Sequence, residues 1–180
     1  LVVEVGNEDI RHVVLSLGDG GEIVGKVVVE GGDTKSLPAA MRVFLESESG
    51  GMMNFRMQGG EVSDDLTFTL RDVGEGDYRF RLMPQPPNLY LKSARVQGKD
   101  ALDQAFDIKN GEKITGVEIV LSGDGGSING AVKQEENGET VKGATVVIFA
   151  AEASRRQPRS RWTRTTQSDQ QGNYRLTGVE

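Results

Sequence analysis

The most unusual chemistry in the sequence lies in residues 155–164, where five arginines surround the single tryptophan of the chain. A guanidinium can form two parallel hydrogen bonds to a carboxylate, and an indole ring offers a flat face for stacking. These side chains together suit acidic glycans or the carboxylates of a partner protein. We interpret this segment as a long hairpin loop whose arginines are solvated. The alternative is a docking site for a partner or a glycan, formed by six residues: Arg155, Arg156, Arg159, Arg161, Trp162 and Arg164.

A catalytic centre would need a nucleophile, a base and a group that orients the base. His12 is the only histidine, and we interpret it as an exposed or rim residue of a strand. No HExxH or GxSxG motif is present. The Gly-Asp-Gly-Gly stretches at 18–21 and 123–126 precede expected strands, whereas a phosphate-binding loop precedes a helix. We predict that the chain is not an enzyme and binds no cofactor.

Acidic residues that could bind calcium occur at several expected turns: Asp64, Asp65, Asp103, Asp107 and Asp169. None of them matches the Asp-x-Asp-x-Asp-Gly spacing of a calcium loop. Aspartates in turns commonly accept hydrogen bonds from their own backbone, so we interpret these as turn residues. Weak calcium binding is the alternative. The absence of cysteine excludes disulfides and thiolate metal sites.

Composition narrows the class of partner. The net charge is -6, which argues against nucleic-acid binding, because that function needs a basic face to displace counterions from phosphates. No stretch approaches the roughly 20 apolar residues that cross a bilayer. Glycine is abundant, at 24 residues, in a chain rich in Val, Thr and Leu, which is typical of tight turns between short strands.

The elements that must position these residues are expected to be strands. Apolar and polar residues alternate in several short segments, as they do in half-buried strands. The alternating sets are Met41, Val43 and Leu45; Leu66, Phe68 and Leu70; Tyr78, Phe80 and Leu82; Val117, Ile119 and Leu121; Val147 and Phe149; Tyr174 and Leu176. The best helical candidate, 101–106, is one turn at most. The pattern predicts an all-β fold of immunoglobulin-like antiparallel sandwiches.

An internal repeat predicts the organisation of the chain. The segment 20–27 recurs 105 residues later as 125–132. Likewise, 8–17 matches 112–121 and 68–73 matches 174–179, at offsets of 104 and 106. Three blocks in the same order at nearly one offset indicate tandem modules.

The repeat divides the chain into three parts. Residues 1–17 are expected to be the closing strands of a preceding module, 18–122 a complete module (the middle module), and 123–180 the opening part of a following one (the third segment). The third segment lacks a counterpart of residues 75–104. The simpler interpretation is an excerpt of a longer chain. In the second interpretation, residues 1–17 of one subunit complete the last module of a neighbouring subunit, although these residues supply few strands for that purpose.

Three motifs in the third segment are familiar. They are Ile128-x-Gly130-x-Val132, then Val141-x-Gly143-Ala144-x-Val146, then Asp169-x-x-Gly172-x-Tyr174-x-Leu176-x-Gly178-Val179. This pattern resembles the carboxypeptidase regulatory-like domain family. Those domains are prealbumin-like β-sandwiches, related in fold to the collagen-adhesin B-type repeats of surface proteins. The resemblance implies tandem copies in a large bacterial surface or secreted protein, and it implies little about function.

Some adhesin repeats carry an isopeptide bond between a lysine of the first strand and an Asn or Asp of the last strand. The middle module has Val28 where the third segment has Lys133, and its last strand, 117–121, contains no Asn or Asp. We therefore predict no such crosslink in the middle module.

These observations predict a non-catalytic structural or adhesive module of a multi-domain extracellular or cell-surface protein, acting as a spacer or an assembly unit. Its expected partners are neighbouring modules of the same chain or identical subunits. The alternative is a carbohydrate-binding accessory module, suggested by related sandwiches and by Trp162. A sugar platform usually needs two or more exposed coplanar aromatics, and aromatic residues make up only 6% of the chain. A further alternative is a head-to-tail extracellular fibre assembled by strand complementation.

Overall fold

The computed structural model describes residue 6 and residues 18–48, 58–86, 88–156 and 160–180. The expectations for His12, Arg159 and the segment 8–17 lie outside the described residues. Within them, the regular elements are thirteen strands and two single 3-10 turns, Thr34–Ser36 and Ala153–Arg155, so the predicted all-β class is confirmed. Residues 101–106 form no helical turn. No helix in the described part is long and apolar enough to span a membrane.

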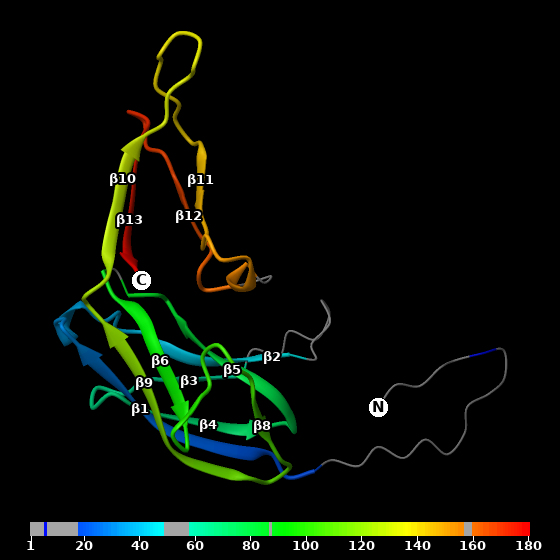
Figure 1. The fold of residues 1–180 in the computed structure, drawn as a ribbon. Coiled ribbons are helices and arrows are strands. Elements are labelled where there is room, and N and C mark those ends of the chain that lie inside the picture. Colours follow the sequence, from blue (N-terminus) through cyan, green and yellow to red (C-terminus); the bar gives the residue numbers. More distant parts are fainter. Residues whose placement is uncertain (1–5, 7–17, 49–57, 87, 157–159) are drawn as a thin grey trace.

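The first nine strands lie in the middle module and form two sheets. In chain order they are β1 (Gly21–Glu30), β2 (Arg42–Ser47), β3 (Gln58–Glu61), β4 (Thr67–Val73), β5 (Gly76–Met83), β6 (Tyr90–Val96), β7 (Lys99–Asp100), β8 (Phe106–Ile108) and β9 (Lys113–Ser122). One sheet has the order β4-β1-β9-β6-β7 and the other β3-β2-β5-β8. Figure 1 shows the two sheets packed together in the lower part of the view.

The core lies between these two sheets, where alternate side chains of facing strands meet. Phe68, Val117 and Ile119 from one sheet and Phe80 from the other are all fully buried. The ring of Phe80 meets Phe68 edge-on at a centroid distance of 6.4 Å and stacks on Phe106 at 4.9 Å. The predicted core positions of the middle module are therefore buried. Tyr78 is only partly buried against this core, with its hydroxyl donating a hydrogen bond to the Gly74 carbonyl.

One strand pair departs from the predicted antiparallel arrangement. β1 pairs with β9 in parallel, from Glu22 opposite Lys113 to Glu30 opposite Ser122. The position of β8 explains this direction. A Cβ built on Gly21, the first residue of β1, would lie only 2.7 Å from the side chain of Ile108, the last residue of β8. β8 thus ends beside the start of β1, and the short turn after it brings β9 alongside β1 in the same direction.

The remaining strands, β10 (Gly126–Ala131), β11 (Thr145–Ile148), β12 (Arg164–Gln167) and β13 (Asn173–Val179), lie in the third segment. They form two pairs, β10-β13 and β11-β12, which extend away from the middle module in Figure 1. The β10-β13 pair repeats the register of β1-β4, since Ile128 lies opposite Leu176 as Ile23 lies opposite Leu70. The β11-β12 pair likewise repeats β2-β3. The sequence repeat is therefore matched by repeated strand pairing, while the predicted module boundaries near residues 18 and 123 remain predictions.

The face of β11 that was predicted to be buried is the wrong one. Val147 and Phe149 do share a face, but their side chains are 48% and 58% exposed. Val146 and Ile148 are the half-buried residues of this strand. At the offset of 105 residues they correspond to Met41 and Val43, which are core residues, so the inward face of β11 follows the repeat.

Candidate docking site

The arginine-rich segment is the connection between β11 and β12, and local hydrogen bonds shape it. The 3-10 turn Ala153–Arg155 starts it. The hydroxyl of Ser160 donates to the Arg155 carbonyl at 2.5 Å and accepts from the Trp162 N–H at 3.2 Å. Arg155 also pairs with Glu152 at 2.7 Å. A serine that bonds both sides of the connection therefore holds the side chains of Arg155 and Trp162 near each other.

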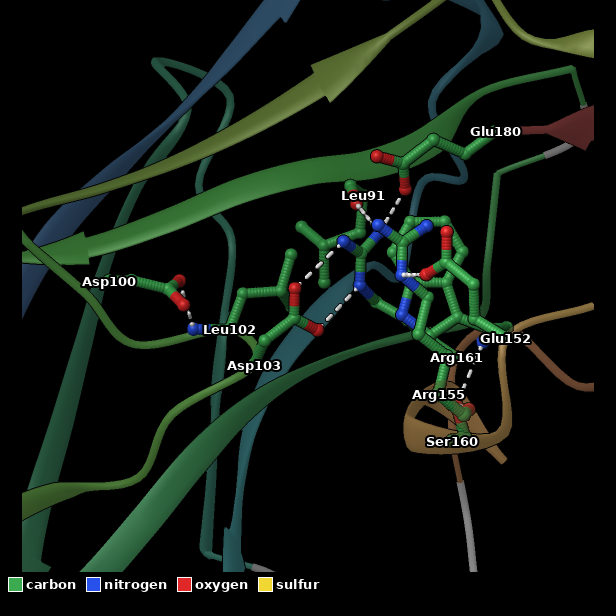
Figure 2. Close-up of polar contacts among 10 residues, drawn as sticks. Leu91, Asp100, Leu102, Asp103, Glu152, Arg155, Ser160, Arg161 and Glu180 are labelled. Atoms are coloured by element: carbon green, nitrogen blue, oxygen red, sulfur yellow. Dashed lines mark hydrogen bonds and ion pairs between the residues drawn. The ribbon is translucent and has the colours of Figure 1, made fainter. Parts of the chain in front are cut away.

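The side chain of Arg161 extends from this loop and contacts the middle module. Its Nε and Nη2 atoms donate to the two carboxylate oxygens of Asp103 at 2.8 and 2.9 Å. Its Nη1 atom donates to the Leu91 carbonyl of β6 at 3.4 Å and also to the carboxylate of Glu180. Figure 2 shows these acceptors converging on one guanidinium. The side chain of Arg161 is only 18% exposed, whereas that of Asp103 is 48% exposed. The contact is therefore a two-pronged ion pair between the two parts of the chain, in which the guanidinium is the mostly buried partner.

Electrostatics keep this pair charged. The hydrogen bond from Arg161 holds the pKa of Asp103 below its ordinary value, with Arg155 and Arg79 adding smaller favourable charge. Burial disfavours the charge on Arg161, but the hydrogen bonds to Asp103 and Glu180 outweigh burial and raise its pKa. Both partners are therefore ionised at neutral pH.

Trp162 is partly buried and is engaged within the chain. The guanidinium carbons of Arg161 and Arg155 lie 3.9 and 4.5 Å from the centroid of its ring. Cation–π contact of this kind is strengthened when the cation is partly desolvated. Arg161 therefore connects the tryptophan to Asp103, and any ligand that stacked on the ring would compete with these arginines.

The other predicted docking residues are placed differently. Arg156 donates to the carbonyls of Ala150 and Ala151 and lies over the ring of Phe149 at 5.0 Å. Arg164 is half-buried and donates to the Gly178 carbonyl, and burial lowers its pKa. The structure thus brings Arg155, Arg161 and Trp162 into one cluster, while Arg156 contacts backbone and a ring at the edge of that loop. Docking by these residues stays a prediction.

A cavity of about 310 Å³ lies beside this cluster. Its lining combines apolar side chains with arginines, and includes Ile128, Ile148, Phe149, Arg155, Arg161 and Arg164. Residues of β6, Tyr90 and Leu91, complete one wall. The cavity therefore lies where the middle module and the third segment meet.

The backbone between the two parts is closely packed. The Gly123 N–H donates to the Glu30 carbonyl at 2.8 Å, and the Asp124 N–H donates to the buried Ser122 hydroxyl. Gly178 has a positive φ of +62°, and a Cβ built on it would lie 2.8 Å from the Leu89 carbonyl oxygen. Glycine is required at that position because it permits both this backbone conformation and this close approach.

Sequence reasoning did not find the partner of Arg161. Asp103 is interpreted from the sequence as a turn residue, with calcium binding as the alternative, and the structure places it against the arginine instead. Two other aspartates are turn residues, as interpreted from the sequence. Asp65 accepts from the Thr67 N–H and hydroxyl, and Asp169 accepts from two backbone N–H groups. In the part of the chain that the structure describes, no three acidic or histidine side chains gather as a metal site would require.

Comparison with known proteins gives limited information. No family model matches the chain and no curated protein matches it in sequence, so the resemblance to carboxypeptidase regulatory-like domains stays a prediction. The solved structures that are similar to this chain include two bacterial proteins. The Bacillus anthracis TIE protein matches with a TM-score of 0.36 and 14% identity, over 88% of this chain and 26% of that one. The Streptococcal ancillary pilin matches with a TM-score of 0.29 and 14% identity, over 88% of this chain and 50% of that one. The chain spans about a quarter and half of their lengths, and at these TM-scores the likeness carries no argument about activity.

Proposed function

We propose that this chain is a stiff, non-catalytic spacer of an extracellular or cell-surface protein, in which consecutive β-sandwich modules are held end to end in one orientation. The observation that carries the proposal is the bond between Arg161 and Asp103. All three guanidinium nitrogens of Arg161 bond within the chain, to acceptors on separate segments. A flexible linker between independent modules would not require this arrangement.

Exposed ion pairs contribute little to stability, because solvent screens them and ordering two long side chains costs entropy. The Arg161 pair differs in geometry, since it is two-pronged and the guanidinium is mostly buried. Packing adds to it, because Gly178 approaches the Leu89 backbone closely and the connection from Ser122 to Gly126 is short. Three kinds of contact thus restrain the same junction.

The proposal can be tested by measuring the distance between the two parts. The chain has no cysteine, so nitroxide labels can be attached at introduced cysteines alone. Arg95→Cys on β6 and Lys142→Cys in the third segment replace exposed residues. Pulsed electron paramagnetic resonance should give a narrow distance distribution in this background, and Arg161→Gln should broaden it.

The matched control is Arg175→Gln, which removes an exposed arginine from β13, away from the junction. It should leave the distribution narrow. A broad distribution in the labelled chain that still carries Arg161 would overturn the spacer proposal, because it would mean that the two parts already move freely.

The glycan-binding alternative has less support. Two guanidiniums already lie over the Trp162 ring, and Arg156 lies over Phe149. A sugar would have to displace at least one of these cations to stack on either ring.

A further inference from the structure

One side of the middle module is closed by a short connecting segment as well as by strands. In the described part of the chain, β7 pairs only with Arg95 and Val96 of β6, and β8 pairs only with residues 76–78 of β5. Between β7 and β8 the chain crosses from one sheet to the other through residues 101–105, which we call the strap. The strap therefore lies where β5 and β6 extend past these short pairings.

Ala101 is the residue at which the strap joins both sheets. Its N–H donates to the Ala94 carbonyl of β6 at 2.8 Å, and its carbonyl accepts from the Phe80 N–H of β5 over a longer distance, 3.4 Å. The side chains of Ala101 and Leu102 are both buried in the core. The Leu102 N–H also donates to the Asp100 carboxylate at 3.0 Å (Figure 2). Opening of the strap would expose these core side chains and free backbone groups on the edges of both sheets.

The remainder of the strap is held from outside the middle module. Asp103 and Gln104 are exposed. Among the described residues, the hydrogen bonds that join 103–105 to another segment all run from Arg161 to the Asp103 carboxylate. The same guanidinium donates to the Leu91 carbonyl of β6. Arg161 thus connects the strap to the edge of β6, as Figure 2 shows.

We propose that the third segment holds the strap closed through Arg161, so that the docking of one module controls the closure of the module before it. This inference rests on the same bond to Asp103 as the spacer proposal, and it assigns that bond a second effect, inside the middle module. Without the bond, hydrogen bonds to other strands hold the strap at Ala101 alone. Local opening costs only the contacts that it breaks, so the strap should then open more often.

Thermodynamic linkage requires this effect to be reciprocal. If the bond from Arg161 favours the closed strap by some factor, closure of the strap favours the docked position of Arg161 by the same factor. A bond that only orients the two parts of the chain would leave the opening of the strap unchanged. The two roles can therefore be separated by measuring the strap itself.

Amide hydrogen exchange, followed by nuclear magnetic resonance on the full chain, measures opening of the strap. The reporters are the N–H groups of Ala101 and Leu102, and the reference is the N–H of Val43, a buried residue of the central strand β2. Asp103→Asn removes the charge at a side chain that is 48% exposed and leaves the arginine loop unchanged. It should speed exchange of both reporters at least about five-fold, and exchange at Val43 should change less than about two-fold.

Arg161→Gln breaks the same bond from the other side and should speed the reporters by a similar factor. Combining it with Asp103→Asn should add little to either change alone, because both variants remove one interaction. The matched control is Arg175→Gln, which should leave the reporters unchanged. Unchanged exchange of Ala101 and Leu102 in the Asp103→Asn chain would overturn the proposal. An equal increase at Val43 would also overturn it, since the whole module would then be loosened.

The reciprocal measurement starts from inside the strap. Leu102→Ala removes a buried strap side chain and keeps both partners of the ion pair. The Nε–H of Arg161, which donates to Asp103 at 2.8 Å, should then exchange at least about five-fold faster. An unchanged rate would contradict the coupling.

The strap proposal and the spacer proposal fail on different results. Unchanged strap exchange in the Asp103→Asn chain, together with a narrow nitroxide distance distribution in the chain that carries Arg161, refutes the strap proposal alone. A broad distribution in that chain refutes the spacer proposal, whatever the strap exchange shows.

Discussion

Replacing Phe80 with alanine should lower the free energy of unfolding of the middle module by about 4–5 kcal/mol. Loss of a buried Phe side chain typically costs about 3–5 kcal/mol, which includes the lost transfer free energy and the cavity that remains. Phe80 belongs in the upper half of that range. Its side chain is 1% exposed, and its ring contacts Phe68 edge-on and Phe106 face-on, and each aromatic pair adds about 0.5–1.5 kcal/mol.

The chain offers a matched control for this change. Phe149→Ala removes the same atoms from a residue that is 58% exposed, so its cost should stay below about 1 kcal/mol. Urea unfolding followed by far-ultraviolet circular dichroism measures both free energies. If Phe80→Ala cost less than about 1 kcal/mol, or Phe149→Ala cost as much as Phe80→Ala, the assignment of the core between the two sheets would be wrong.

Three further outcomes follow from the junction. Because the hydrogen bond from Arg161 lowers the pKa of Asp103, the contact should be complete above the ordinary carboxyl pKa of about 4 and be lost as pH falls through the lower folded value. The nitroxide distance distribution should therefore be narrow at pH 7 and broaden in acid, and Asp103→Asn should remove most of this pH dependence. Native trypsin should cut after the exposed Arg156 before it cuts after Arg161, which peptide mass mapping can show; the reverse order would contradict the burial of Arg161. Gly178→Ala places a Cβ 2.8 Å from the Leu89 carbonyl oxygen, and should destabilise the third segment by more than about 1 kcal/mol in unfolding followed by tryptophan fluorescence; an unchanged midpoint would show that the backbone contact is not needed.

Period-two alternation was sufficient to predict the class of fold and much of the core. Phe68 and Phe80 each lie between polar residues, so only one face of each strand could be buried. β11 lacked that information, since four successive apolar residues, 146–149, give no polar partner to mark the outer face. The exposed face was chosen there for this reason.

The repeat indicated which strands are equivalent, but not the direction in which partners run. The parallel β1-β9 pair depends on where β8 ends, which is a property of the folded sandwich. The sequence likewise indicated only part of the candidate site. The arginines and Trp162 stand out in composition, whereas Asp103 lies 58 residues away from Arg161 in the sequence and has no local signal that marks it as a partner.

The parallel pairing of β1 with β9 has a mechanical consequence. The chain enters the middle module at the start of β1 and leaves it at the end of β9, and these two points lie at opposite ends of one ladder. Tension applied through the two ends therefore pulls the strands past each other along their length. Under that shear the hydrogen bonds from Glu22 to Glu30 share the force together, whereas antiparallel strands pulled from one end would separate one pair at a time.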